Sequence, residues 1–327
     1  MKLETASSLE DLKFGEDQLI PVVVQDYISR EVLMVAYANK VALTKTIETG
    51  FAYFWSRRRK ELWLKGESSG NMLKIAEVRI DCDNDTVLYL AEPYGPTCHT
   101  GMTSCFHKRL KDAEKVENKY EQEIASEIVS YYENARVVKR RWVRDGSKKT
   151  YEFILSSITE HVPPPSPRVI AWLVNKIDSI TSDNIDKVVV PEALGLPIGA
   201  IVSQIKKKPM AIVRKKPFHS DEYLLDKVKY ASGYEKGSYY IYGVKKNDKI
   251  LIIDDTISTG GTLEALLQSF IKNDVKVTDV VCVMEKIWYH GSDSIKTKLG
   301  IDVKSLIQVN KKGNALKCVF VDYDSKP

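Results

Sequence analysis

The chain has 327 residues, and its 49 Lys and Arg residues against 44 Asp and Glu residues give a formal net charge of +5. At roughly 150 residues per domain this length predicts about two domains, and a hydrophobic content of 43% supports a core in each. The small charge gives no reason to expect a nucleic-acid partner, and no apolar run approaches the roughly 18 residues that a membrane helix needs. Because the N-terminal residues also lack the apolar core of a secretory signal, we expect a cytoplasmic protein without membrane or nucleic-acid partners.

The first hundred residues predict an α+β domain of mostly antiparallel strands. Short β-prone runs alternate there with turn-forming segments, and the runs cover residues 19–25, 32–37, 52–56, 62–64, 74–80 and 86–91. A charged, helix-forming stretch follows over residues 108–136. We therefore expect one domain over residues 1–112 and a second over residues 113–327.

The second domain alternates strand and helix. Strands are expected at residues 187–190, 210–213, 249–253 and 277–284, with helices at residues 196–206 and 263–273. Such alternation predicts an α/β fold with a parallel sheet and a ligand at the carboxyl ends of its strands. The sequence contains neither the GxGxxG nor the GxxxxGK fingerprint, so it predicts no Rossmann dinucleotide site and no Walker loop.

A cluster of acids in the first domain predicts a metal site. Asp81, Asp83 and Asp85 alternate with Cys82 and Asn84, so in an extended strand the three carboxylates would share one face and the thiol would take the other. Carboxylate oxygens suit Mg²⁺, whereas a thiolate suits Zn²⁺.

Two further cysteines follow within 24 residues. Cys98 and Cys105 would complete a set of three thiolates, which leaves the fourth tetrahedral position of a zinc ion open, as in catalytic zinc sites. Zinc lowers the pKa of a bound water to roughly 7, and His99 could act as the accompanying base or acid.

Five segments in this part of the chain resemble phosphoribosyl-AMP cyclohydrolase of histidine biosynthesis. In chain order they are YFWSR, ELWLKG, DCDND, GPTCH and TGMTSCF, and the resemblance covers roughly residues 10–110. It implies hydrolysis of the N1–C6 bond of phosphoribosyl-AMP. It also implies a homodimer that shares zinc between subunits, with Mg²⁺ on Asp81, Asp83 and Asp85 and with Zn²⁺ on Cys82, Cys98 and Cys105.

The run KILIIDDTISTGGT at residues 249–262 predicts a phosphate-binding loop. Consecutive backbone N–H groups and hydroxyls before a helix suit a phosphate, and Gly260 and Gly261 allow a close backbone approach. Asp254 and Asp255 at the entry of the loop suit ribose hydroxyls.

This run resembles the PRPP-binding motif of type I phosphoribosyltransferases, most closely the archaeal hypoxanthine and xanthine type, over about residues 130–320. The resemblance implies catalytic roles for Asp254 and Asp255 and a contact between Lys286 and the purine base. It implies PRPP contacts from Asp254, Asp255, Thr256, Ile257, Ser258, Thr259, Gly260, Gly261, Thr262, Arg214 and Lys215.

Together these features predict a bifunctional enzyme that binds phosphoribosyl-AMP, PRPP and a purine base. The sequence leaves open whether the base is adenine or a 6-oxopurine such as hypoxanthine or guanine. Two alternatives also stay open: the second domain could sense purines or PRPP without catalysis, and the first could hold metal for structural reasons alone.

Overall fold

We describe a computed structural model of the chain over residues 8–144, 147–156, 158, 164–218, 220, 222–233, 235–312 and 315–323. The chain forms two compact units, Met1–Glu114 and Lys115–Pro327, and each is treated below by itself. Within the described residues, no helix is both long enough and apolar enough to cross a membrane.

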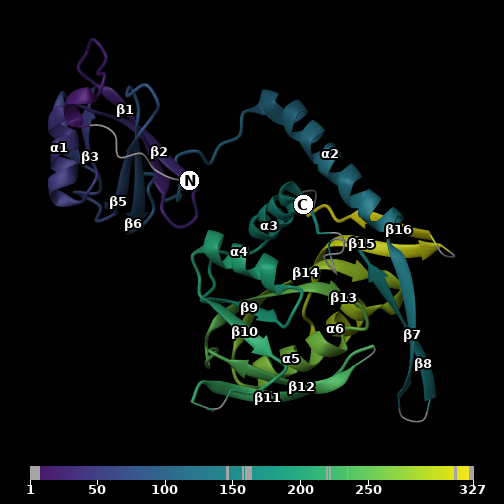
Figure 1. The fold of residues 1–327 in the computed structure, drawn as a ribbon. Helices are drawn as coiled ribbons and strands as arrows, with labels where there is room; N and C mark the ends of the chain where they lie inside the picture. The colour runs from purple at the N-terminus through teal and green to yellow at the C-terminus, as the bar shows by residue number, and fades with distance from the viewer. Residues whose placement is uncertain are drawn as a thin grey trace. The chain divides into compact units, whose positions relative to one another are not determined.

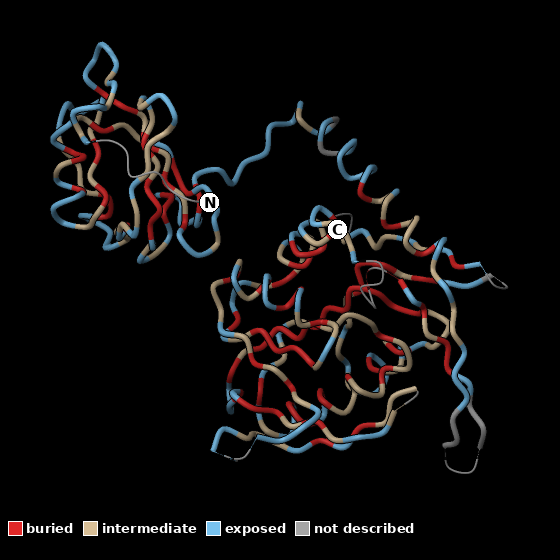
Figure 2. Tube along the Cα trace, viewed as in Figure 1, coloured by how far each residue is buried: buried red, intermediate tan, exposed pale blue. Residues whose placement is uncertain are grey.

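The first unit is built on a four-stranded sheet in the order β2-β1-β6-β5. Its pairs are antiparallel except for the central pair of β1 with β6, which is parallel. A separate hairpin, β3–β4, and helix α1 pack beside the sheet, and buried residues line its middle (Figures 1 and 2). The elements are β1 (Ile20–Asp26), β2 (Val32–Ala38), α1 (Lys40–Thr49), β3 (Tyr53–Ser56), β4 (Glu61–Leu64), β5 (Leu73–Ile80) and β6 (Val87–Pro93), preceded by a short 3-10 helix, Leu9–Asp11.

The acidic segment of this unit is a turn, as its position between two β-prone runs predicts, so the strand geometry considered for Asp81–Asp85 does not apply. It connects β5 to β6, and Asn84 adopts a left-handed φ of 64° there. Asn tolerates that conformation better than most residues, and its presence among short polar side chains favours a turn over a strand.

The second unit is an α/β domain around an eight-stranded sheet in the order β11-β12-β10-β9-β13-β14-β15-β16. The five strands from β10 to β15 in this order are parallel, and the flanking strands β11, β12 and β16 are antiparallel. The strands are β9 (Lys187–Pro191), β10 (Met210–Arg214), β11 (Leu224–Ala231), β12 (Lys236–Tyr242), β13 (Lys249–Ile257), β14 (Lys276–Lys286), β15 (Lys304–Lys312) and β16 (Ala315–Phe320).

Helices cover both faces of this sheet (Figure 1). One buried core contains residues of α2, α3 and α4 and the other contains residues of α5 and α6, and alternate side chains of β13 contribute to each. Leu251 and Ile253 lie in the first core, whereas Ile250 and Ile252 lie in the second, as the two-residue period of a strand requires. The helices are α2 (Glu114–Glu133), α3 (Pro167–Ile180), α4 (Leu196–Lys206), α5 (Gly261–Lys272) and α6 (Gly291–Leu299), with short 3-10 helices at Lys111–Ala113 and Ile287–Tyr289.

The alternating pattern of the sequence did not reveal a two-stranded hairpin of β7 (Arg136–Arg144) and β8 (Ser147–Leu155), which forms a small sheet of its own (Figure 1). Its many basic residues interrupt the apolar alternation that would indicate two strands. Tyr151 of β8 is buried, with an exposed fraction of 4%. This hairpin is important for the pocket described below.

Candidate active sites

The three acids of the first unit converge on one point. The carboxylate oxygens that Asp81, Asp83 and Asp85 can offer to a metal all lie within 4.8 Å of one another. The backbone amides of Asp85 and Thr86 donate to Asp81 Oδ1 at 3.0 and 3.1 Å. Although burial works to raise it, these hydrogen bonds lower the pKa of Asp81, so the group is held ionised. The donor set of three carboxylates fits a hard divalent cation.

Two of the three cysteines lie together. The Cys98 and Cys105 thiols are within hydrogen-bonding reach of each other, and the Thr100 hydroxyl donates to Cys98 Sγ at 3.1 Å. The Cys105 amide donates to the Leu33 carbonyl at 2.8 Å, which fixes the cysteine loop against β2.

Lys65 lies beside this thiol pair and is only 9% exposed. Hydrogen bonds from Thr100 are the main cause that lowers the pKa of Cys98, and the Lys65 charge adds to the effect. Burial raises the pKa of Cys105 and lowers that of Lys65. The sequence offers Lys65, like Arg57 and Arg58, as a charge partner for substrate phosphates, but nothing in the pattern ELWLKG places its ammonium next to sulfur.

Cys82 does not join the other two cysteines within one chain. Among the described residues, the three acids are the only group of three or more His, Cys, Asp or Glu side chains whose ligand atoms converge. Cys82 is exposed in the acidic turn, and His99 is exposed next to Cys98. One chain therefore presents two separate sulfur sites, one with a single thiol and one with a pair.

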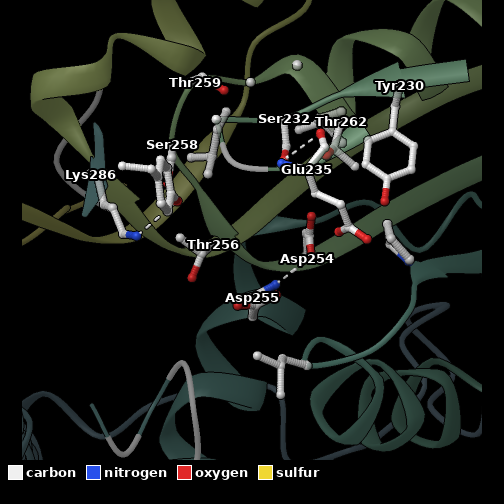
Figure 3. Close-up of a pocket in the computed structure, with 18 of the residues that line it drawn as sticks. Tyr230, Ser232, Glu235, Asp254, Asp255, Thr256, Ser258, Thr259, Thr262 and Lys286 are labelled. Atoms are coloured by element: carbon white, nitrogen blue, oxygen red, sulfur yellow. Dashed lines mark hydrogen bonds between the residues drawn. The ribbon is translucent and has the colours of Figure 1, made fainter. Parts of the chain in front are cut away.

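The second unit has a pocket of about 280 Å³ at the carboxyl ends of its parallel strands. Residues 254–262 line it, from the end of β13 through the loop of residues 258–260 to the start of α5, and the turn between β11 and β12 forms one wall (Figure 3). The remaining walls come from β8, from the loop after β9 and from the end of β14. Of the residues predicted to bind PRPP or the base, the pocket is lined by Asp254, Asp255, Thr256, Ile257, Ser258, Thr259, Gly260, Gly261, Thr262, Lys215 and Lys286.

The loop of residues 258–260 is held by close backbone packing. Gly260 has a φ of +75°, and a Cβ there would lie 2.9 Å from the Gly291 carbonyl oxygen, so only glycine fits without strain. The loop leads directly into α5, whose N-terminal amides carry the positive end of the helix dipole. The Thr256 hydroxyl is buried without a protein hydrogen-bond partner in the described structure. These features together suit an anion.

The two acids at the loop entry differ in their electrostatics. Asp254 is half-buried, and both its desolvation and the negative charge of Asp255 raise its pKa well above the usual range. Its Oδ1 accepts a hydrogen bond from the Asp255 amide at 2.9 Å.

Only one of the two predicted basic residues after β10 reaches the pocket. Lys215 Nζ lies 3.0 Å from Glu235 Oε2 in the β11–β12 turn, and the Lys215 amide donates to Glu192 Oε2 at 2.9 Å. The Arg214 guanidinium instead lies 4.1 Å from the centre of the Phe218 ring, in a second hollow. Arg214 is the last residue of β10 and Lys215 lies in the bend that follows it, and the two side chains line different hollows.

Lys286 lies at the opposite end of the pocket and is 4% exposed. Its Nζ donates to the Tyr151 hydroxyl and to the Glu152 carbonyl, both at 3.0 Å. Both partners belong to the β7–β8 hairpin. This ammonium is therefore held by the hairpin rather than extended into open solvent.

Comparison with known proteins agrees with this division of the chain. The phosphoribosyl-AMP cyclohydrolase family matches residues 34–107, and the phosphoribosyl transferase domain family matches residues 164–313. The phosphoribosyl-AMP cyclohydrolase of Archaeoglobus fulgidus is 55% identical over 104 residues, which is 32% of this chain and 96% of that protein. The chain belongs to the phosphoribosyl-AMP cyclohydrolase family.

Other matches extend this picture. The cyclohydrolase of Methanosarcina acetivorans is 58% identical over 103 residues, which is 32% of this chain and 85% of that protein. For the second unit, an adenine phosphoribosyltransferase structure from Thermoanaerobacter pseudethanolicus is 22% identical and covers 56% of this chain and 98% of its own, with a TM-score of 0.43. The match to the cyclohydrolase family lies in the first unit, and the match to the phosphoribosyl transferase domain family lies in the second.

The raised pKa of Asp254 makes a prediction about stability. When folding raises the pKa of a carboxyl, the folded domain loses stability as pH rises above the unfolded pKa of about 3.9, because the native state disfavours the charged form. Asp254→Asn keeps the acceptor for the Asp255 amide but removes this charge. We expect it to raise the calorimetric Tm of the second unit at pH 8 by roughly 2–4 °C, the shift that about 1 kcal/mol gives in a domain of this size.

The difference in Tm should shrink toward zero at pH 4, where the wild-type carboxyl is largely protonated. Asp293→Asn, at an exposed position in α6, is the matched control and should leave Tm nearly unchanged at both pH values. A lower Tm for Asp254→Asn at pH 8 would contradict the electrostatic argument.

Proposed function

We propose that the chain is a bifunctional enzyme of purine–phosphoribosyl chemistry. The first unit would open the purine ring of phosphoribosyl-AMP by hydrolysis of the N1–C6 bond, and its 55% identity to a cyclohydrolase carries this proposal. The second unit would transfer the phosphoribosyl group of PRPP to a purine base. The convergence of the acidic pair, the anion-suited loop and Lys215 on one pocket supports this second activity.

The side chains of the first unit fit the metals that such a hydrolysis would use. Asp81, Asp83 and Asp85 would hold Mg²⁺, and Cys82, Cys98 and Cys105 would hold Zn²⁺. When bound, zinc would activate the attacking water and magnesium would offset the charge of the substrate phosphates. His99 is exposed next to Cys98 and would take up or deliver the proton that the ring nitrogen needs.

The separation of Cys82 from the thiol pair supports a zinc site shared between two subunits. Cys98 and Cys105 of one chain would meet Cys82 of the partner subunit. Apolar side chains near the cysteine loop are exposed in the single chain: Val35 of β2 is 47% exposed and Phe106 is 61% exposed. Covering them in a homodimer would add apolar burial to the metal bonds.

A mixed-dimer experiment tests the shared site. Cys82→Ala and the double variant Cys98→Ala/Cys105→Ala should each be inactive as cyclohydrolases, because every site lacks at least one thiolate. Unfolding and refolding them together at equal amounts should give about half mixed dimers, each with one intact site, so roughly a quarter of wild-type activity should return. Zinc content measured by atomic absorption should rise in parallel. If mixed dimers form and neither activity nor zinc returns, the three thiolates do not come from two chains.

In the second unit, Asp254 and Asp255 would contact the ribose hydroxyls of PRPP. The backbone and hydroxyls from Thr256 to Thr262 would bind the 5′-phosphate, and Lys215 would bind pyrophosphate. As the C1′–O bond to pyrophosphate breaks, positive charge develops on the ribose while a purine nitrogen attacks C1′. The protein's contribution would be positioning and charge stabilisation.

The two activities should be separable by mutation. Asp254→Asn/Asp255→Asn removes the carboxylates proposed to hold the ribose, so base ribosylation should fall by at least about a hundredfold. Cyclohydrolase turnover of the same preparation should stay near wild type, because its residues belong to the other compact unit. An equal loss of both activities would rule out independent sites.

Base choice should depend on Lys286. An ammonium donates to the exocyclic oxygen of hypoxanthine or guanine, whereas the exocyclic amine of adenine offers it no comparable acceptor. Lys286→Ala should therefore reduce kcat/KM for a 6-oxopurine about tenfold more than for adenine, since a hydrogen bond to a charged group contributes about 1.5–3 kcal/mol. Steady-state assays with each base and PRPP measure this ratio, and an unchanged ratio would remove Lys286 from the specificity of the site.

A further inference from the structure

A chain of hydrogen bonds on one side of the pocket of the second unit joins Lys286 to the loop after β13. Lys286 Nζ donates to the Tyr151 hydroxyl at 3.0 Å, and that hydroxyl lies 2.7 Å from Ser258 Oγ in the phosphate-binding loop. Lys286 and Ser258 lie on the same side of the pocket in Figure 3. Tyr151 comes from the β7–β8 hairpin, so an element outside the main sheet makes this connection.

The position of Tyr151 is tightly determined. Its ring stacks on Tyr289 with centroids 5.3 Å apart and makes an edge contact with Phe153 at 4.7 Å. A Cβ on Gly233, in the β11–β12 turn, would lie 2.5 Å from this ring, so the turn packs directly against it. The hydroxyl therefore has little freedom to move away from Ser258 and Lys286.

The neighbouring Glu152 fixes the hairpin to the rest of the unit. Its amide donates to the Tyr289 hydroxyl at 3.0 Å, and its carboxylate accepts from Lys311 of β15 at 2.5 Å. Although burial works to raise the pKa of Glu152, the Lys311 and Lys139 ammonium groups lower it, which keeps the carboxylate charged. Tyr151 is thus presented to the pocket by a hairpin that is ion-paired to the sheet.

The chemistry of the donors gives the chain of bonds a direction. An ammonium only donates, so the Tyr151 oxygen accepts from Lys286 and its own hydrogen is available to Ser258. Ser258 can then accept from Tyr151 and donate its hydrogen to an anion in the loop. Successive hydrogen bonds of this kind polarise one another, so an anion at Ser258 would strengthen the bond from Tyr151 and, through it, the bond from Lys286.

We propose that Tyr151 is a positioning residue that couples phosphate binding in the loop to base binding at the Lys286 end of the pocket. This inference rests on the proposed phosphoribosyl transfer, which requires both ligands. A phosphate on the loop strengthens the Lys286–Tyr151–Ser258 chain, so the base meets a Lys286 ammonium that is held more firmly. The coupling is reciprocal, because linkage requires the base to favour phosphate by the same factor.

Equilibrium binding tests this coupling without turnover. The probes are ribose 5-phosphate for the loop and hypoxanthine or adenine for the base end, titrated into the full-length protein by calorimetry. For the wild type, saturating ribose 5-phosphate should lower the Kd of at least one base by about five- to tenfold, at the lower end of measured couplings between sites. Tyr151→Phe keeps the ring contacts but removes the hydroxyl, and it should bring this factor to about one.

Tyr289→Phe is the matched control, because it removes a hydroxyl of the same aromatic stack that accepts from the Glu152 amide and has no part in the Lys286–Tyr151–Ser258 chain. It should retain the wild-type coupling factor. Ser258→Ala removes the hydroxyl at the other end of the hydrogen-bond chain and changes no residue of the hairpin. It should also bring the coupling factor to about one, and it tests the proposal even if Tyr151→Phe fails to fold.

The outcomes separate this inference from the function it rests on. A wild-type protein that binds neither ribose 5-phosphate nor a base would overturn the proposed transferase site itself. Binding of both ligands with no coupling in the wild type, or with the same coupling in Tyr151→Phe and Ser258→Ala, would overturn the role of Tyr151 alone. A coupling lost equally in Tyr289→Phe would assign it to general packing of the hairpin.

Discussion

The pairing of β13 with a parallel neighbour on each side is the constraint on which the pocket of the second unit depends. Ile250, Leu251 and Ile252 pair with β9 while the whole strand pairs with β14, so the strand can neither shift nor rotate. Alternate side chains enter two separate cores, and a one-residue slip would exchange them. The point at which Asp254 and Asp255 leave the core is fixed by this register.

The same register explains why Lys286 lies near the phosphate-binding loop. Ile257 of β13 pairs with Glu285 of β14, so the next residue on each strand is Ser258 and Lys286 respectively. Residues 28 positions apart in sequence are therefore brought to one edge of the sheet. The β7–β8 hairpin then only has to supply one side chain, Tyr151, to connect them.

Much of the fold could be predicted because most elements follow simple periods. Strand β9, helix α4 and strand β14 have apolar runs with clear turn signals, and they form within one or two residues of the expected bounds. The β7–β8 hairpin was not predicted from the sequence, because many of its residues are basic. It therefore lacks the alternation of apolar and polar residues that indicates a strand with one buried face. The acidic segment forms a turn between β5 and β6, as its short polar residues predict, and Asn84 adopts a left-handed φ there.

The candidate sites were less accessible to sequence reasoning, because they depend on contacts between distant segments. Arg214 and Lys215 are adjacent in the sequence, which gives no sign that their side chains line two different hollows. Nothing in the sequence around Lys65 indicates that it lies beside Cys98, and nothing around Tyr151 indicates that it contacts Ser258. Such pairs come together only in the folded chain, so their contacts can be recognised only from the structure.

The ion pair between Lys215 and Glu235 has a consequence for how an anion enters the pocket. Without a ligand, the cation already has an internal counter-charge 3.0 Å away, on the turn between β11 and β12. In the proposed transfer, pyrophosphate would displace this carboxylate, so its binding would be an exchange of anions rather than the filling of an empty positive site. Since added salt screens both the old pair and the new one, the affinity should vary less steeply with ionic strength than for an uncompensated lysine.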